Sequence, residues 1–372
     1  MSYLGKHIPK LGFGLMRLPM LGDEIDIRQT QAMVDKFLAA GFTYFDTAYG
    51  YHDGKSEEAA NRTLVDRYPR ARFQLATKLP AWSGAKNADE ARKMLFTSLK
   101  RTGAEYFDFY LLHNCGAERT KAFDEFGLWD FVLEQREKGF IKHVGFSFHD
   151  TADVLDDILT KHPEMEFVQL QINYADWNSP TVQSHRCFET AKKHGKPVVI
   201  MEPVKGGLLA KPMPRLAQIL NEASAHASPS SWAMRFAASL DNVITVLSGM
   251  SNMEQMDDNL ATMTDFHPLN DAEYAVIERV RDALNAIESI PCTQCRYCVK
   301  GCPQKIAIPD IFDALNQYLV FDNLEPPKRF YGFLTRNGNT AGTCVECGQC
   351  EAVCPQHIGI MRELKRAEAA FE

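Results

Sequence analysis

The chain has 372 residues, a formal net charge of −7 and an isoelectric point near 5.9. The acidic balance excludes the broad basic surface typical of nucleic-acid-binding proteins, and no apolar run approaches the roughly 20 residues that cross a bilayer. We therefore expect a cytoplasmic protein of more than one domain, with a small-molecule substrate and neither a nucleic-acid nor a membrane partner.

Short apolar runs alternate with amphipathic helical stretches over about the first 270 residues. Repeated strand–helix units of this kind predict an α/β fold with a parallel sheet. The expected strands lie at residues 10–16, 42–46, 73–78, 106–112, 141–147, 167–172, 197–202 and 243–248. The expected helices lie at residues 28–40, 56–67, 88–102, 125–138, 151–161, 181–194, 214–239 and 253–263. Eight units suit a closed (β/α)8 TIM barrel, whereas a doubly wound open sheet would need a G-x-G-x-x-G turn, which is absent.

Polar residues close several of the predicted strands, where barrel enzymes carry their active sites. Asp46 and Tyr51 follow the second strand, Lys78 ends the third and His113 follows the fourth. One reaction that these groups could serve is the reduction of a carbonyl. That reaction leaves an alkoxide, so an acid must protonate the oxygen, and a phenol with a pKa of about 10 needs tuning. We expect Lys78 to lower the pKa of Tyr51, and Asp46 to keep Lys78 charged. His113 would orient the substrate oxygen.

These residues resemble the aldo-keto reductase family, whose barrel carries an Asp-Tyr-Lys-His tetrad at the same strand ends. The resemblance covers most of residues 1–265 and rests on the runs DTAYGY at 46–51 and GKSE at 54–57, followed by Lys78 and His113. It implies catalytic roles for the tetrad and a nicotinamide cofactor, NADH or NADPH. It also implies cofactor contacts from Ser147, Gln169 and Asn259. Independently of the resemblance, Lys205 and Gly206 are expected to contact a cofactor phosphate through their backbone N–H groups. Gly249, Met250 and Gln255 stand where the family commonly has Lys, Ser and Arg, so a strong preference for NADPH is not expected.

Eight of the ten cysteines form two runs near the C-terminus, each reading C-x2-C-x2-C-x3-C-P. They are Cys292, Cys295, Cys298 and Cys302, and Cys344, Cys347, Cys350 and Cys354. Bacterial-type ferredoxins hold 4Fe-4S clusters with this run. Four-thiolate zinc is the alternative, but it leaves the close fourth Cys and the repeated proline unexplained.

The resemblance to two-cluster ferredoxins implies that the fourth Cys of each run serves the other cluster. Cys354 would then join the first three cysteines of the first run, and Cys302 those of the second. The whole chain most resembles the branch of aldo-keto reductases with a C-terminal two-cluster 4Fe-4S domain.

Three segments are expected: a barrel over residues 1–267, a helical linker over 268–290 and a helix-rich ferredoxin-like two-cluster domain over 291–372. Between the cysteine runs, residues 309–320 read as a helix and residues 326–342 as a turn-rich stretch.

We expect an oxidoreductase that reduces a carbonyl or related small substrate and uses its clusters for one-electron transfer. A hydride carries two electrons together, whereas each cluster accepts one at a time, so a flavin is a further candidate cofactor. The alternatives are an electron-transfer subunit with a non-catalytic barrel, and a flavin-mediated reductase supplied by ferredoxin or another redox protein.

Overall fold

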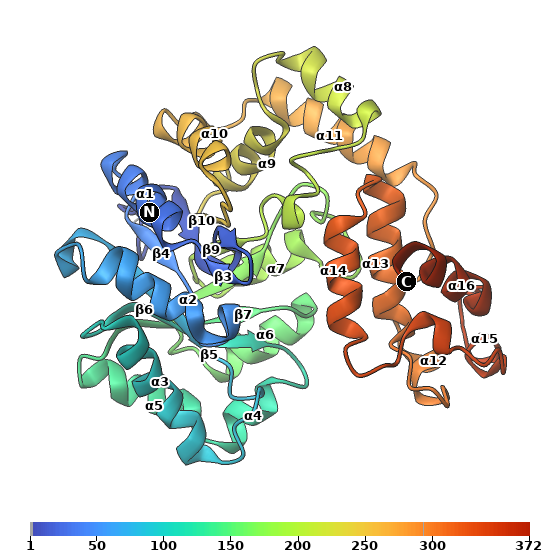
Figure 1. Ribbon diagram of the computed structural model, residues 1–372, viewed down its shortest axis with the longest axis horizontal. Helices are drawn as coiled ribbons and strands as arrows, with labels where there is room; N and C mark the ends of the chain where they lie inside the picture. The colour runs from blue at the N-terminus through green and yellow to red at the C-terminus, as the bar shows by residue number, and fades with distance from the viewer. Residues whose placement is uncertain (1–2, 293) are drawn as a thin grey trace. The chain divides into compact units, whose positions relative to one another are not determined.

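The computed structural model describes residues 3–292 and 294–372 (Figure 1). The chain divides into two compact units, one formed by Met1–Val204 and Ser230–Leu269 and the other by Lys205–Pro229 and Asn270–Glu372. The expected domain boundaries at residues 267 and 290 stay predictions. Within the described residues, no helix has both the length and the apolar character needed to cross a membrane.

Eight parallel strands of the first unit close into a barrel, in the order β1-β10-β9-β8-β7-β6-β5-β4. They are β1 (Leu11–Gly14), β4 (Tyr44–Asp46), β5 (Gln74–Leu79), β6 (Phe107–Cys115), β7 (Ile141–Phe148), β8 (Phe167–Gln171), β9 (Val198–Met201) and β10 (Val243–Ser248). Each overlaps one predicted strand, and the predicted TIM barrel is confirmed. A short antiparallel hairpin, β2 (Met20–Leu21) with β3 (Glu24–Ile25), was not predicted.

Helices follow the strands and cover the barrel (Figure 1). In the first unit they are α1 (Ile27–Ala39), α2 (Lys55–Ala60), α3 (Ala88–Thr102), α4 (Thr120–Glu125), α5 (Leu128–Glu137), α6 (Ala152–Lys161), α7 (Ser184–Lys193), α9 (Pro229–Ala238) and α10 (Met253–Thr264). Side-chain hydrogen bonds and glycine residues set the ends of some of these helices. The Asn87 side chain accepts a hydrogen bond from the Glu90 amide to start α3, and Gly103 ends that helix at φ 64°.

The predicted helix over residues 214–239 is wrong as a single element, because the structure has two helices there. The first, α8 (Pro214–Ala223), ends at Ser224, whose backbone is extended at φ −157° and ψ 105°. The second, α9, starts at Pro229, which favours extended backbone in the residue before it.

Inside the barrel an apolar layer supports a polar one. The apolar layer includes Tyr44, Ala76, Phe109, Leu111 and Phe167, all buried. The Phe109 ring centre lies 5.1 Å from that of Tyr44 and 5.2 Å from that of Phe167, so aromatic rings fill the interior. Side chains two residues apart on a strand point to the same face. The residues two positions further along these strands are polar, and they form the next layer. It contains Asp46, Lys78, His113 and Gln169.

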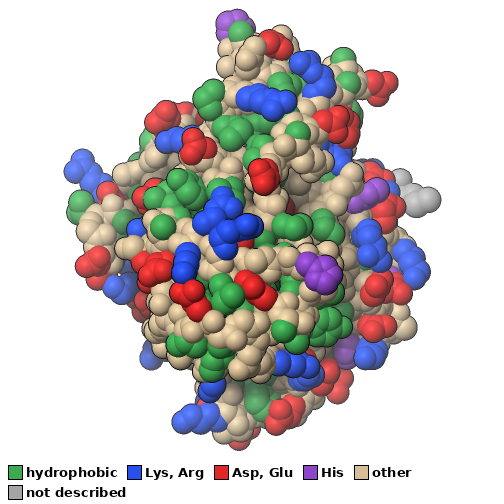
Figure 2. All heavy atoms as spheres, turned by 90° about the vertical axis from the view of Figure 1, so that its right-hand side faces the viewer, with side chains coloured by type: hydrophobic (Ala, Val, Ile, Leu, Met, Phe, Trp, Pro, Cys, Tyr) green, Lys and Arg blue, Asp and Glu red, His purple; other side chains and the backbone are tan. Residues whose placement is uncertain are grey.

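The second unit is helical, which confirms the expected helix-rich C-terminal domain. Its helices are α8, α11 (Asp271–Asn285), α12 (Tyr297–Lys300), α13 (Ile308–Phe321), α14 (Glu325–Leu334), α15 (Gln349–Ala352) and α16 (Ile360–Phe371). The turn-rich prediction for residues 326–342 is wrong at its start, because α14 begins there. Pro326 lies in the first turn of α14, where a proline is tolerated because the amide hydrogens there have no helical partner. Acidic and basic side chains are interspersed on the face drawn in Figure 2.

Candidate functional site

Lys78 is at the centre of the polar layer of the barrel. Its ammonium donates to Asp46 Oδ1 over 2.5 Å, to the Thr47 carbonyl over 2.7 Å and to Tyr51 Oη over 3.3 Å. An ammonium has three protons, so each of them has an acceptor. Lys78 and Asp46 are almost fully buried, at 1% and 3% exposure. The structure thus brings the phenol against a buried ion pair.

Charge and burial act in opposite directions on these groups. Burial alone lowers the pKa of Lys78, but Asp46 and Tyr51 outweigh burial, so the pKa of Lys78 is raised and the ammonium stays charged. Burial raises the pKa of Asp46, and Lys78 opposes that rise.

The expectation of a net lowered pKa for Tyr51 is wrong, although the expected lowering effect of Lys78 is present. Burial raises the pKa of this phenol above its ordinary value, and Lys78 acts in the lowering direction without cancelling the effect of burial. Tyr51 is therefore held protonated, the form needed by a proton donor.

His113 lies beside Tyr51, with their ring centres 6.0 Å apart in an edge-to-face arrangement. Burial lowers its pKa well below the ordinary value, and the nearby charges of Lys78 and Arg119 lower it further. A neutral imidazole can donate one hydrogen bond. Its Nδ1 is buried and has no hydrogen-bond partner among the described residues.

Arg101, a residue missed in the sequence analysis, anchors the turn that carries Tyr51. His52 and Asp53 follow Tyr51 in left-handed backbone, at φ 50° and 55°. Arg101, on α3, donates to the Tyr49 carbonyl over 2.9 Å and pairs with the buried Glu57 at 3.3 Å. No local pattern identifies Arg101, because its partners lie 44 or more positions away.

Two of the expected nicotinamide contacts lie side by side. Ser147 on β7 and Gln169 on β8 are register partners, and both are buried. Gln169 Nε2 donates to Asp46 Oδ2 over 3.2 Å, and Ser147 Oγ accepts from the Asn114 amide over 2.7 Å. The Ser147 hydroxyl proton and Gln169 Oε1 have no hydrogen-bond partner among the described residues. Together they suit the oxygen and the amino group of a carboxamide. These residues fit a nicotinamide.

The other expected contacts are less direct. Asn259 is buried and donates to Ser248 Oγ over 2.7 Å, so it holds the end of β10. Lys205 and Gly206 belong to the second unit and have left-handed backbone, at φ 49° and 64°. The roles of all three in cofactor binding stay predictions.

A charged pair missed in the sequence analysis lies near the Tyr51 phenol. Arg17 pairs with Glu202 at 3.3 Å, and Glu202 is close enough to act electrostatically on Tyr51. A side-chain carbon placed on Gly249 would lie 3.3–3.4 Å from the Arg17 stem. Arg17 therefore brings a basic group to the loop that starts at Gly249, in which Met250 is fully buried.

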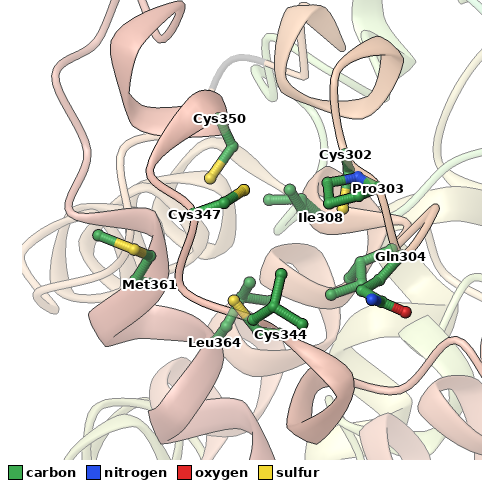
Figure 3. A pocket seen from close by; sticks show the side chains of 11 residues that line it. Cys302, Pro303, Gln304, Ile308, Cys344, Cys347, Cys350, Met361 and Leu364 are labelled. Carbon is green, nitrogen blue, oxygen red and sulfur yellow. The ribbon is translucent and has the colours of Figure 1, made fainter.

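The eight clustered cysteines line two cavities in the second unit. One cavity has thiols from Cys302, Cys344, Cys347 and Cys350. Figure 3 shows these four side chains around one open space, with Cys302 contributed by a separate segment. The other cavity has thiols from Cys292, Cys295, Cys298 and Cys354. The fourth Cys of each run thus faces the cavity of the other run.

The backbone repeats itself around the two cavities. Left-handed residues recur two and four positions after the first Cys and three positions after the fourth. They are Gln294, Arg296 and Lys305 in the first run, and Glu346, Gly348 and His357 in the second. Each run also contains a four-residue helix, α12 or α15, before its fourth Cys. The same chain path therefore builds both sites.

The arrangement of four thiols around each cavity suits a cluster. Four thiolates on one zinc, with Zn–S bonds of about 2.3 Å, would converge to within about 4 Å of each other. No three His, Cys, Asp or Glu side chains in residues 3–292 and 294–372 converge to hold one ion. A 4Fe-4S cluster binds each thiolate on a different iron and suits ligands spread around a cavity. Burial raises the pKa of Cys298 to about 11, so binding of iron there would have to displace the thiol proton.

Two family models match the chain. Residues 10–282 match the Aldo/keto reductase family, and residues 291–358 match the 4Fe-4S dicluster domain. An aldo-keto reductase from Mycobacterium sp. (strain JLS) is 25% identical over 283 residues, which are 75% of this chain and 91% of that relative. Methylglyoxal reductase DkgA from Escherichia coli O157:H7 is 27% identical over 188 residues, 47% of this chain and 60% of that relative.

Solved structures share the barrel. An aldo-keto reductase from Bacillus halodurans in its holo form has a TM-score of 0.60 and 24% identity, and the match covers 75% of this chain and 95% of that one. An aldo-keto reductase from Klebsiella pneumoniae in complex with NADPH has a TM-score of 0.58 and 22% identity, and the match covers 74% of this chain and 91% of that one. At this identity the likeness shows the fold. These relatives give no support to the flavin, which was a candidate cofactor.

Proposed function

The chain belongs to the aldo/keto reductase family and carries a 4Fe-4S dicluster domain, and from that premise we propose that it reduces the carbonyl group of a small organic substrate at the C-terminal end of the barrel strands. The observation that carries the proposal is the Lys78 ammonium, which is shared between Asp46 and the Tyr51 phenol. An ion pair with a purely structural role would not need a phenol beside it.

The residues have complementary tasks in this reaction. The carbonyl carbon receives a hydride, which brings two electrons, and its oxygen receives a proton from Tyr51 Oη. Lys78 stabilises the phenolate that remains, and Asp46 keeps Lys78 charged and in place. His113, which is neutral, donates a hydrogen bond to the substrate oxygen and orients it towards Tyr51. A bound nicotinamide supplies the hydride.

We propose NADH or NADPH as the cofactor, held at its carboxamide by Ser147 and Gln169. The paired donor and acceptor on β7 and β8 support this role, and so does the NADPH complex of the similar Klebsiella pneumoniae protein. We assign Lys205, Gly206 and Asn259 to the rest of the cofactor.

The clusters would carry single electrons between the protein and a redox partner such as ferredoxin, in the cytoplasm. One thiol of each cavity is exposed, Cys295 in one and Cys347 in the other, which supports electron exchange at the surface. The same observation favours the second candidate function, an electron-transfer subunit whose barrel is not catalytic.

The test uses the whole protein, purified anaerobically with its clusters. Oxidation of NADH and NADPH is followed with methylglyoxal, suggested by the name of one relative, and with a panel of other aldehydes and ketones. Tyr51→Phe should reduce the rate roughly 10²-fold or more, because a positioned acid contributes on that scale.

Tyr106→Phe is the matched control, because Tyr106 precedes β6 at the opposite end of the barrel. That variant should keep the wild-type rate. If the wild type reduces no carbonyl compound, or if Tyr51→Phe is as active as the wild type, the electron-transfer function is preferred.

A further inference from the structure

Arg119 lies at the C-terminal end of β6, close to the reacting groups. Its guanidinium carbon is 5.0 Å from the centre of the Trp82 ring, and that ring is 6.2 Å from the His113 ring. Trp82 Nε1 donates to the His113 carbonyl over 2.6 Å, which fixes the indole. Arg119 and His113 therefore pack against the same indole, and His113 contacts Tyr51 in turn.

The guanidinium is also held by Asn114. Arg119 donates to Asn114 Oδ1 over 3.2 Å. Asn114 has left-handed backbone, at φ 61°, and its amide is bonded to Ser147 Oγ. Arg119 is exposed, and its contacts with the Asn114 side chain and the Trp82 ring leave most of its five N–H donors without a protein partner among the described residues. The group is oriented in advance, which reduces the entropy lost on binding.

The carboxylates around Arg119 are engaged elsewhere. Glu118 pairs with Lys121 at 2.7 Å, and Glu202 pairs with Arg17. Asp150 accepts from the amides of Ala117 and Thr151, and Asp124 accepts from Trp129 Nε1. Among residues 3–292 and 294–372, no acidic side chain forms an ion pair with Arg119. Arg119 is thus a cation beside the site that has no ion-pair partner among these residues.

We propose that Arg119 binds an acidic group of the substrate, so that the preferred substrates are aldehydes or ketones that carry a carboxylate or a phosphate. This inference rests on the proposed carbonyl reduction. The carbonyl oxygen lies between Tyr51 and His113, and the acidic group lies several bonds away, beyond the edge of Trp82. Trp82 covers the carbon chain between them, and its 38% exposure leaves apolar surface for that contact.

The first experiment compares two substrates of almost equal shape, succinic semialdehyde and its uncharged methyl ester. The wild type should favour the acid in kcat/KM by roughly 10- to 100-fold, the range expected for a charge-assisted hydrogen bond. Arg119→Met should bring the two substrates to within about threefold, mainly by raising KM for the acid. Arg119→Lys should keep part of the preference, since it keeps the charge and loses the planar fork.

Arg92→Met is the matched control, because Arg92 is another exposed arginine, 5.8 Å from the centre of an aromatic ring, that of Phe131. This variant should retain the full preference. A turnover-independent measurement is the binding of succinate by calorimetry, at low and at high salt. Arg119→Met should weaken succinate binding by the same factor, and added salt should weaken it in the wild type.

The outcomes separate the two proposals. Turnover of both substrates without preference for the acid overturns the role of Arg119 and leaves the carbonyl reductase intact. Absence of turnover with succinate binding that depends on Arg119 overturns the proposed reaction and supports the anion site. If Arg119→Met weakens NADPH as much as succinate, the acidic group belongs to the cofactor, and the substrate assignment is wrong.

Discussion

The Tyr51 phenol accepts a hydrogen bond from the Lys78 ammonium over 3.3 Å, yet its pKa is raised by burial. The sequence alone favours a lowered pKa, because the neighbouring lysine can be recognised in the sequence and the burial of the phenol cannot. The difference matters for catalysis, since a proton donor must still hold its proton at the working pH.

The pH dependence of carbonyl reduction distinguishes a raised from a lowered pKa of Tyr51. A raised pKa keeps Tyr51 protonated below it, so the rate should be nearly flat from about pH 6 to 9 and fall only as the pH rises through that pKa. A lowered pKa would place the fall within that range. The measurement is kcat/KM across the range, with Tyr51→Phe as the background.

The buried ion pair should be costly to break on one side. Lys78→Met leaves the Asp46 carboxylate buried without its cation and should reduce the free energy of unfolding by about 3–5 kcal/mol. The double variant Asp46→Asn, Lys78→Met removes both charges and should recover most of that loss. Both variants should be inactive. Denaturant unfolding of the three proteins checks the order, and equal losses in the two variants would contradict it.

His113 should make the barrel sensitive to acid. Its pKa is lowered in the folded protein, whereas the unfolded chain protonates it near pH 6.5. The unfolded state therefore binds more protons, and stability falls as the pH drops below about 6.5, by at most about 1.4 kcal/mol per pH unit. His113→Gln should lose less stability than the wild type between pH 7 and 5. The difference between the two proteins removes the contribution of acid damage to the clusters.

Cross-ligation predicts which thiols are freed when one cysteine is removed. Cys354→Ala should destabilise the cluster of the cavity lined by Cys295, and Cys302→Ala that of the cavity lined by Cys347. Both reporter thiols are exposed. Anaerobic alkylation followed by peptide mass spectrometry should label Cys295 in the first variant and Cys347 in the second. The reverse pattern would show that each run closes its own site.

Iron and sulfide analysis completes that experiment. The wild type should contain about eight of each per chain, and each variant about half as much. Stoichiometric zinc without sulfide would refute the cluster assignment.

The cofactor preference depends on Arg17 and its partner. Glu202 neutralises Arg17 at 3.3 Å, so we expect NADPH and NADH to bind within about tenfold of each other. Glu202→Gln frees the guanidinium and should shift the ratio towards NADPH, and Arg17→Met should abolish that shift in the double variant. Dissociation constants at two salt concentrations give the answer. A large NADPH preference that survives in Arg17→Met would place the phosphate elsewhere.

Local patterns in the sequence determined much of this protein. Eight apolar runs with polar ends specified the barrel strands, because a buried parallel strand is marked by its own residues. The repeated cysteine spacing specified two cluster sites, because ligands close in the chain are close in space. The polar residues at the ends of these runs identified Asp46, Tyr51, Lys78 and His113 as candidate site residues.

Only the tertiary structure decided the surroundings of those residues. The Arg101 contact with the Tyr49 turn, the Arg17–Glu202 pair and the stacking of Arg119 on Trp82 join residues 37 to 185 positions apart. Such pairs leave no periodic trace in the sequence. Burial of the Tyr51 phenol, which sets the sign of its pKa shift, likewise depends on every strand around it. Desolvation and long-range contacts arise when the barrel closes, and the order of residues along the chain does not record them.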